Sequence, residues 1–293
     1  MRKSILISLI LSISTYLCGQ TYQLQYKGSI SSPSIKGYVR DASFYNDTCY
    51  FITGDGSTVL MTDINGRLLS NHFSGLSLDE ARMIYVNANH IVILEQAKIS
   101  FYTKQGQYVK QIALPDTKSF YFFVRNDEEI MVASYNRILV YNYATGSLMA
   151  QKNLTRDFTR RFINDGKRIL CPREKLMAYE RQGTQIVETD ITTTKYAEYA
   201  DINSGHYFYL SCHTGTKSLW FDYLKRDTLF VMDSSFTTMI GTYPLLPISQ
   251  KPSEEELYIE SGNPNLKIIC AQRKIYVIET PLNGIKFYRL MGL

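Results

Sequence analysis

The sequence predicts an all-β fold, a six-bladed β-propeller whose blades are four-stranded antiparallel sheets. The main observation is a repeat, because the turn glycines Gly66, Gly106 and Gly146 follow one another at a spacing of forty residues. A fixed period near forty, built from short strands, is typical of propeller blades. The apolar runs between the turns are rich in β-branched and aromatic residues, and the chain has 23 Tyr and 14 Phe. This composition favours many half-buried strands.

Each repeat unit reads as four strands joined by turns. In the second unit, strands are expected at 82–86, 90–95, 99–102 and 108–114. Asn, Asp and Gly stand between these runs because they tolerate the backbone angles of tight turns. The same order recurs along the chain, which places six blades at about 37–73, 82–114, 119–154, 158–191, 206–245 and 257–290.

One further strand is expected before the first blade. Residues 22–30 alternate apolar and polar side chains, which is typical of a strand with one buried face. Propellers commonly close when a terminal strand completes the last sheet, and we expect 22–26 to pair beside 285–288. Such closure removes exposed sheet edges and holds the ring shut.

The first nineteen residues read as a signal peptide, which leaves 20–293 as a single propeller domain. A basic pair at positions 2 and 3 precedes an apolar run at 5–17, and this run is too short to span a bilayer. Cleavage after Gly19 would release an exported chain, periplasmic or secreted, and the mature chain is expected to be soluble. The alternative is lipidation of Cys18, which would make the protein an outer-membrane lipoprotein.

The net charge bears on the kind of partner, and the cysteine content bears on possible disulfide bonds. The formal net charge is +5 with acids and bases interspersed, which gives no case for nucleic-acid binding. Four cysteines follow the signal peptide, and an even number in an exported chain permits two disulfides. The blade map brings Cys49 near Cys270 and Cys171 near Cys212, so these pairs are the disulfide hypotheses. Four buried thiols are the alternative.

The period, the six units and the terminal strand resemble the six-bladed propellers with TolB-like or NHL-like blades. The signal peptide ends in Cys18-Gly19-Gln20, and the mature chain is rich in Tyr and Lys; both features resemble members that Bacteroidetes-type bacteria export. The resemblance covers nearly all of the mature chain. It implies the architecture and carries over no catalytic motif.

Motifs for catalysis and cofactor binding are missing from the sequence. It has no Gly-x-Ser-x-Gly elbow, no Walker loop, no Gly-x-Gly-x-x-Gly and no Asp-x-Asp-x-Asp-Gly calcium loop. We therefore expect no cofactor; calcium is the alternative, although no motif supports it. His206, Cys212 and His213 form the one cluster of metal-ligand types. Positions 212 and 213 point to opposite faces of a strand, so no metal site is expected there.

The centre of the ring is the candidate ligand site. The innermost strands of a propeller line a central channel, and their first residues would meet at its mouth. The side chains expected there are Arg40, Asp41, Arg82, Tyr121, Arg160, His206 and Glu260. Arginine binds carboxylate or phosphate through two contacts, so this mouth would suit an anionic ligand. The alternative is a wet channel whose polar residues have no ligand.

These observations favour a non-enzymatic exported scaffold that binds a protein, a peptide or a cell-surface glycan at one ring face, within the cell envelope. No residue set shows the nucleophile, base and orienting group that catalysis requires. One alternative is a hydrolase or lyase at the channel mouth that acts on an anionic or lactone-like substrate. A second alternative is a component of an envelope assembly, anchored by lipid at Cys18.

Overall fold

The computed structural model describes residues 23–31, 39–54, 56–69, 78–115, 119–134, 136–154, 162–172, 175–193, 208–214, 217–222, 228–233, 235, 237–244, 266–271, 274–279 and 284–291. Within these residues every regular element is a β-strand and all strand pairs are antiparallel. No helix in this part of the chain is long and apolar enough to cross a membrane.

The described strands form six sheets, taken here in chain order. The first sheet holds β2 (Val39–Tyr45), β3 (Thr48–Thr53) and β4 (Val59–Asp63). The second holds β5 (Met83–Val86), β6 (Ile91–Leu94), β7 (Lys98–Tyr102) and β8 (Tyr108–Ala113). The third holds β9 (Ser119–Arg125), β10 (Glu129–Ser134), β11 (Arg137–Asn142) and β12 (Leu148–Asn153). The fourth holds β13 (Ile163–Asn164), β14 (Ile169–Pro172), β15 (Leu176–Gln182) and β16 (Gln185–Asp190).

The last two sheets continue the same order. The fifth holds β17 (Phe208–Thr214), β18 (Lys217–Asp222), β19 (Thr228–Asp233) and β20 (Met239–Pro244). The sixth holds β21 (Leu266–Ala271), β22 (Lys274–Glu279) and β23 (Gly284–Met291), and β1 (Gln23–Ser31) is its outermost strand.

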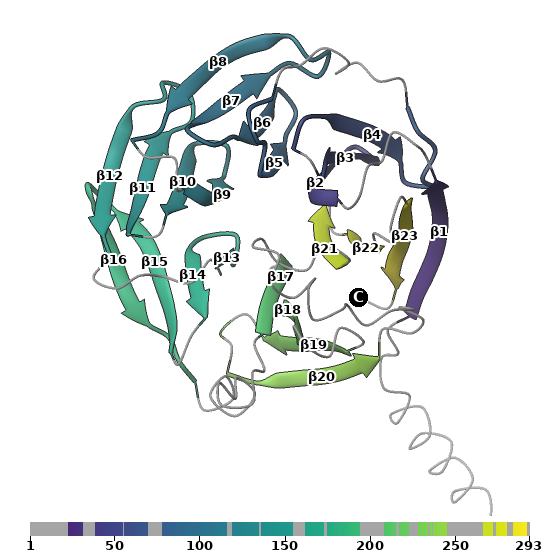
Figure 1. Ribbon diagram of the computed structural model, residues 1–293. Coiled ribbons are helices and arrows are strands. Elements are labelled where there is room, and N and C mark those ends of the chain that lie inside the picture. The colour runs from purple at the N-terminus through teal and green to yellow at the C-terminus, as the bar shows by residue number, and fades with distance from the viewer. Residues whose placement is uncertain are drawn as a thin grey trace, which may run out of the picture.

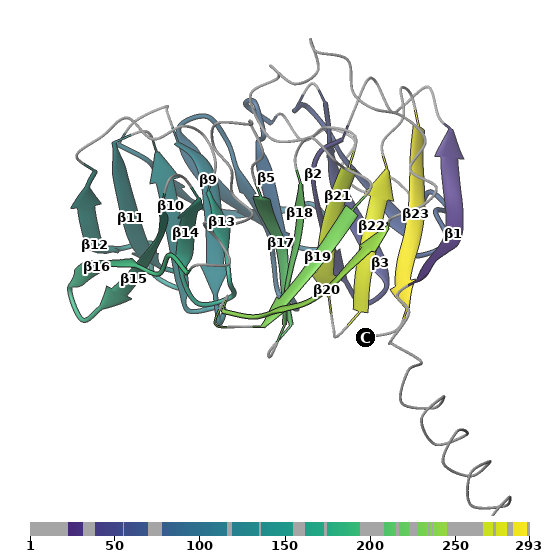
Figure 2. The same ribbon diagram turned by 90° about the horizontal axis from the view of Figure 1, so that it is seen from below.

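The six sheets stand around a common centre in the order in which the chain makes them (Figure 1). The strands nearest the centre are β2, β5, β9, β13, β17 and β21, and the strands of each sheet run between the two faces of the ring (Figure 2). Innermost strands of neighbouring sheets are in contact, as β2 is with both β5 and β21. One face carries the turns between first and second strands and between third and fourth strands; we call it the turn face.

The turns of this face follow from residue chemistry. Gly66, Gly106 and Gly146 have φ of 84°, 80° and 73°, the left-handed region that glycine enters without steric cost. The forty-residue period therefore marks turns at equivalent places in three successive sheets. Asn126 and Asp127 also have positive φ, 52° and 57°, and Asn and Asp tolerate this conformation better than other side chains do.

The sheets pack face to face, and their middle strands are buried on both sides. All four residues of β6 and all six of β10 are buried. This explains why these strands read as nearly continuous apolar runs rather than as an alternation. One core cluster joins β6–β8 to β9–β11, and a second joins β10–β12 to β14–β16. The core is therefore divided into layers between neighbouring sheets.

Two expectations about the ends of the repeat meet the structure in different ways. In the described residues the first sheet has three strands, and after the turn at Gly66, Thr62 also bridges Leu68; positions 70–73, where the fourth strand is expected, lie outside the described residues. Before the first sheet, β1 pairs with β23 from Gln23 opposite Met291 to Ser31 opposite Gly284. Residues 23–31 therefore lie beside the C-terminal strand, but 23–26 pair with 288–291 rather than with the expected 285–288, and 285–287 pair with 28–30 instead.

Candidate functional site

The structure describes four of the seven residues expected at the channel mouth. Arg40 and Asp41 lie on β2, Arg82 directly precedes β5, and Tyr121 lies on β9, so they come from three consecutive innermost strands (Figure 1). The expected residues Arg160, His206 and Glu260 lie outside the described residues. A ligand role for this set stays a prediction.

The two described arginines bind the backbone of the following sheet. Arg40 Nη1 donates to the carbonyl oxygen of Ala81 at 3.1 Å, and Arg82 Nη1 donates to that of Ser119 at 2.6 Å. Each guanidinium thus crosses from the start of one innermost strand to the start of the next. These contacts therefore link each blade to the following one.

Asp41 and Tyr121 make links of the same kind. Asp41 Oδ2 accepts from the Ile84 amide at 2.8 Å, and two residues further along, Ser43 Oγ accepts from the Val86 amide at 3.1 Å. An innermost strand has a free edge whose N–H groups need partners, and here the preceding blade supplies them. Tyr121 Oη accepts from Asn164 Nδ2 at 2.7 Å. Burial is the main reason why the pKa of Tyr121 is raised.

The predicted disulfides are not seen in the described residues. Cys49 is buried in β3, and burial raises the pKa of its thiol above the usual range. Cys171 is buried in β14. The side chains of Cys212 and Cys270 lie outside the described residues, so both pairings stay predictions. Among the residues that the structure does describe, no group of three or more His, Cys, Asp or Glu could hold a metal ion.

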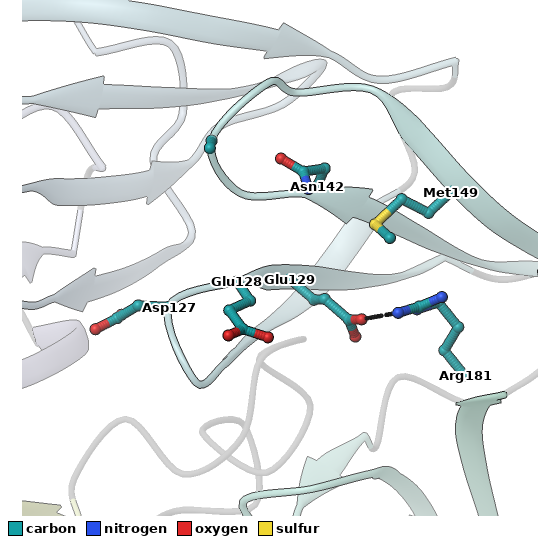
Figure 3. Close-up of a pocket in the computed structure, with 7 residues that line it drawn as sticks. Asp127, Glu128, Glu129, Asn142, Met149 and Arg181 are labelled. Atoms are coloured by element: carbon teal, nitrogen blue, oxygen red, sulfur yellow. Dashed lines mark hydrogen bonds and ion pairs between the residues drawn. The ribbon is translucent and has the colours of Figure 1, made fainter. Parts of the chain in front are cut away.

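A pocket opens on the turn face, at the boundary between the third and fourth sheets. Its volume is about 280 Å³, and it is lined by Asp127, Glu128, Glu129, Asn142, Ala144, Met149 and Arg181. Figure 3 shows Arg181 against the carboxyl group of Glu129, with Asp127 and Glu128 further along the same turn. Three carboxylates and one guanidinium make the lining acidic, while Ala144 and Met149 supply an apolar part.

Glu129 holds the pocket together across the two sheets. Its side chain is only 6% exposed, yet it contacts two arginines. Arg125 Nη2 lies 2.5 Å from Glu129 Oε2, and Arg181 Nε donates to Oε1 at 2.7 Å. A carboxylate removed from water needs such partners. Because Arg181 comes from β15 and Glu129 from β10, the pair also joins neighbouring blades.

The other walls are turns that their own hydrogen bonds hold rigid. Glu128 N donates to Arg125 O at 3.0 Å, and Tyr143 N donates to Glu128 O at 2.8 Å. Asn142 Oδ1 accepts from the Thr145 amide at 2.8 Å. A β-bulge skips Met149 in the pairing of β11 with β12, so this residue has no strand partner and lies in the pocket wall. The pocket is therefore largely pre-formed.

A polar and aromatic cluster adjoins the pocket through Asp127. Asp127 Oδ1 accepts from Tyr85 Oη at 2.8 Å and from Asn87 Nδ2 at 2.7 Å. Asn87 also donates to Tyr143 Oη at 3.0 Å, and this hydroxyl lies 3.1 Å from His90 Nδ1. Burial is the main cause that raises the pKa of Tyr143 to about 12. The phenol is therefore neutral and can donate its proton to His90.

His90 makes the fold sensitive to acid. Burial, and then the charges of Lys110 and Lys104, lower the pKa of His90 below its ordinary 6.5. The His90 imidazole therefore binds a proton more readily in the unfolded chain than in the folded chain. The free energy of unfolding falls as the pH drops through 6.5, and it stops falling once His90 is protonated in the folded chain as well. We expect His90→Gln to have a smaller loss of stability between pH 7 and pH 5. Urea unfolding at several pH values in this range measures the free energy of unfolding. If this free energy fell equally with pH in the variant and the wild type, the prediction would be contradicted.

Sequence reasoning missed the pocket. Two side-chain signals were present: consecutive acids at 128 and 129, and an arginine in a strand of the following unit, Arg181. The sequence does not show that these groups face each other, because they lie 52 residues apart. Their meeting depends on how far each sheet is rotated about the ring.

Comparisons with known proteins find likeness in the backbone and none in sequence. No protein-family model and no curated protein matches the chain. A Bacteroides fragilis protein that is predicted to be exported matches with a TM-score of 0.60 and 9% identity, over 94% of this chain and 96% of the other. The Neurospora crassa Pan2 WD40 domain matches with a TM-score of 0.57 and 9% identity, over 93% and 96%.

A chain in the Saccharomyces cerevisiae structure of Dbp5 bound to Nup159, Gle1, IP6 and ADP matches with a TM-score of 0.51 and 8% identity, over 92% and 96%. At such low identity these likenesses show the fold alone. They do not separate the TolB-like or NHL-like type from other propellers. The conclusion that they support is that this chain is a β-propeller.

Proposed function

We propose that this chain is an exported β-propeller of six blades, closed by β1, that binds a protein partner at the turn face. The observation that carries the proposal is the pocket of Asp127, Glu128, Glu129, Asn142, Ala144, Met149 and Arg181. A rigid site needs little ordering when it binds, so more of the contact energy appears as affinity. The backbone likeness to the Bacteroides fragilis protein, which is itself predicted to be exported, supports the proposed location.

The lining indicates which part of a partner would enter. Glu128 is exposed at the pocket, and Asp127 offers a carboxylate beside it. These groups suit the positive end of a lysine or arginine, while Met149 and Ala144 can contact its aliphatic stem. Glu129 is already neutralised by two arginines and would serve to hold the wall. The proposed partner therefore presents a basic side chain on an exposed segment.

A photo-crosslinking residue at position 128 tests this proposal in the native host. A matched variant carries the same residue at Glu80, which is exposed and precedes an innermost strand at the other ring face. We expect position 128 to capture one protein through a segment that contains lysine or arginine. With this protein and the captured partner both purified, Glu128→Lys should weaken binding at least tenfold, about 1.4 kcal/mol. A lysine-to-glutamate change at the contact residue of the partner should restore binding. Equal capture from both positions, or no effect of Glu128→Lys, would overturn the proposal.

A further inference from the structure

Lys104 spans the boundary between the first and second sheets on the turn face. It lies in the turn between β7 and β8, which Thr103 holds by accepting the amides of Gln105 and Gln107 on Oγ1, at 3.3 and 3.2 Å. Its ammonium nitrogen lies 4.1 Å from the ring centroid of Tyr45 and 5.2 Å from that of Tyr50. Both distances are within the range of cation–π attraction.

The Lys104 ammonium has N–H donors that the described residues around it do not satisfy. Nζ is buried and has no hydrogen-bond partner among the described residues, although an ammonium carries three N–H donors. Burial lowers the pKa of Lys104 to about 8. The two tyrosine rings thus favour a positive charge, while no described residue accepts a hydrogen bond from its N–H groups.

A methylated ammonium would avoid this conflict. It keeps the positive charge that attracts aromatic faces, and a quaternary nitrogen has no N–H donor to satisfy. Aromatic groups that surround a cation without hydrogen-bond acceptors are a recurring way to recognise such groups. Lys104 is attached to a turn rather than to a strand, so its side chain can leave the rings without breaking strand pairing.

We propose that Tyr45 and Tyr50 form a binding site for a quaternary ammonium group, and that Lys104 occupies this site from within the chain. The site lies between the first and second sheets, apart from the acidic pocket at the third and fourth. It does not depend on the basic partner proposed above. A ligand with a trimethylammonium head would displace Lys104 and bind against the same two rings.

Calorimetric titration with tetramethylammonium chloride tests the site. Lys104→Ala removes the internal occupant, and we expect it to bind the probe saturably and at least tenfold more tightly than the wild type, in which Lys104 competes. Ammonium chloride should bind Lys104→Ala at least tenfold more weakly than the methylated probe, because its N–H donors stay unsatisfied. Lys104→Met, whose chain fills the space without charge, should bind weakly.

Ring variants in the Lys104→Ala background locate the binding. Tyr45→Phe keeps the aromatic face and should keep the affinity, while Tyr45→Leu should lower it at least tenfold. Thermal unfolding of each variant establishes that it is folded before titration. No saturable binding by Lys104→Ala, equal affinity for ammonium, or unchanged affinity after Tyr45→Leu would each overturn the proposal.

Discussion

Replacement of Glu129 by alanine is expected to lower the free energy of unfolding by about 3–5 kcal/mol. The Glu129 side chain is 6% exposed and lies between Arg125 and Arg181. Without it, two guanidinium groups would stay in a partly buried place and lose their common counter-charge. Breaking a buried ion pair from one side is costly because the remaining charge is no longer compensated. At roughly 2–4 °C per kcal/mol for a chain of this size, the melting temperature should fall by about 10 °C.

The neighbouring residue provides the matched control. Glu128 has the same side chain but is exposed, and exposed substitutions usually change stability by less than about 0.5 kcal/mol. Urea unfolding of Glu129→Ala, Glu128→Ala and wild type at pH 7 gives both numbers. If the two variants unfolded at the same urea concentration, Glu129 would have no special role in holding the third and fourth sheets together.

Deletion of residues 21–31 is expected to have the largest effect on stability. The deleted segment includes β1, which pairs with β23 at eight positions. At about 1 kcal/mol for each hydrogen bond, the loss is comparable with the net stability of a typical protein, about 5–15 kcal/mol. We therefore expect the shortened chain to melt at least 10 °C lower or to lose its cooperative transition.

A synthetic peptide of residues 21–31 serves as the control for this deletion. Since it can pair only with the vacated edge of β23, its addition should raise the melting temperature of the shortened protein in a saturable way. A peptide of scrambled order should not. A shortened chain that melts at the temperature of the chain 20–293 would show that β1 does not hold the ring closed.

The sequence was most informative where structure depends on a few neighbouring residues. The turns at Gly66, Gly106 and Gly146 need a left-handed backbone, and glycine adopts it at low cost. Strand positions in the second unit agree to within one residue with β5, β6, β7 and β8.

The candidate site was less accessible to sequence reasoning. Arg40 and Arg82 were expected to bind a ligand, which stays a prediction; the structure shows in addition that each donates to a backbone carbonyl of the next blade. An arginine that starts an innermost strand has the same sequence signal in both roles. Whether it links two blades depends on whether an acceptor lies within reach in the neighbouring sheet.

The sequence by itself determined the class of fold, the repeat and the turns, because these follow from backbone preferences and hydrophobic patterns over a few residues. Only the tertiary structure decided that Glu129 meets Arg181 and that Lys104 lies over Tyr45. These partners are about fifty residues apart or more. They meet because neighbouring sheets pack at a particular angle around the ring, a geometry that arises from the sum of all contacts between layers and is not written in any local motif.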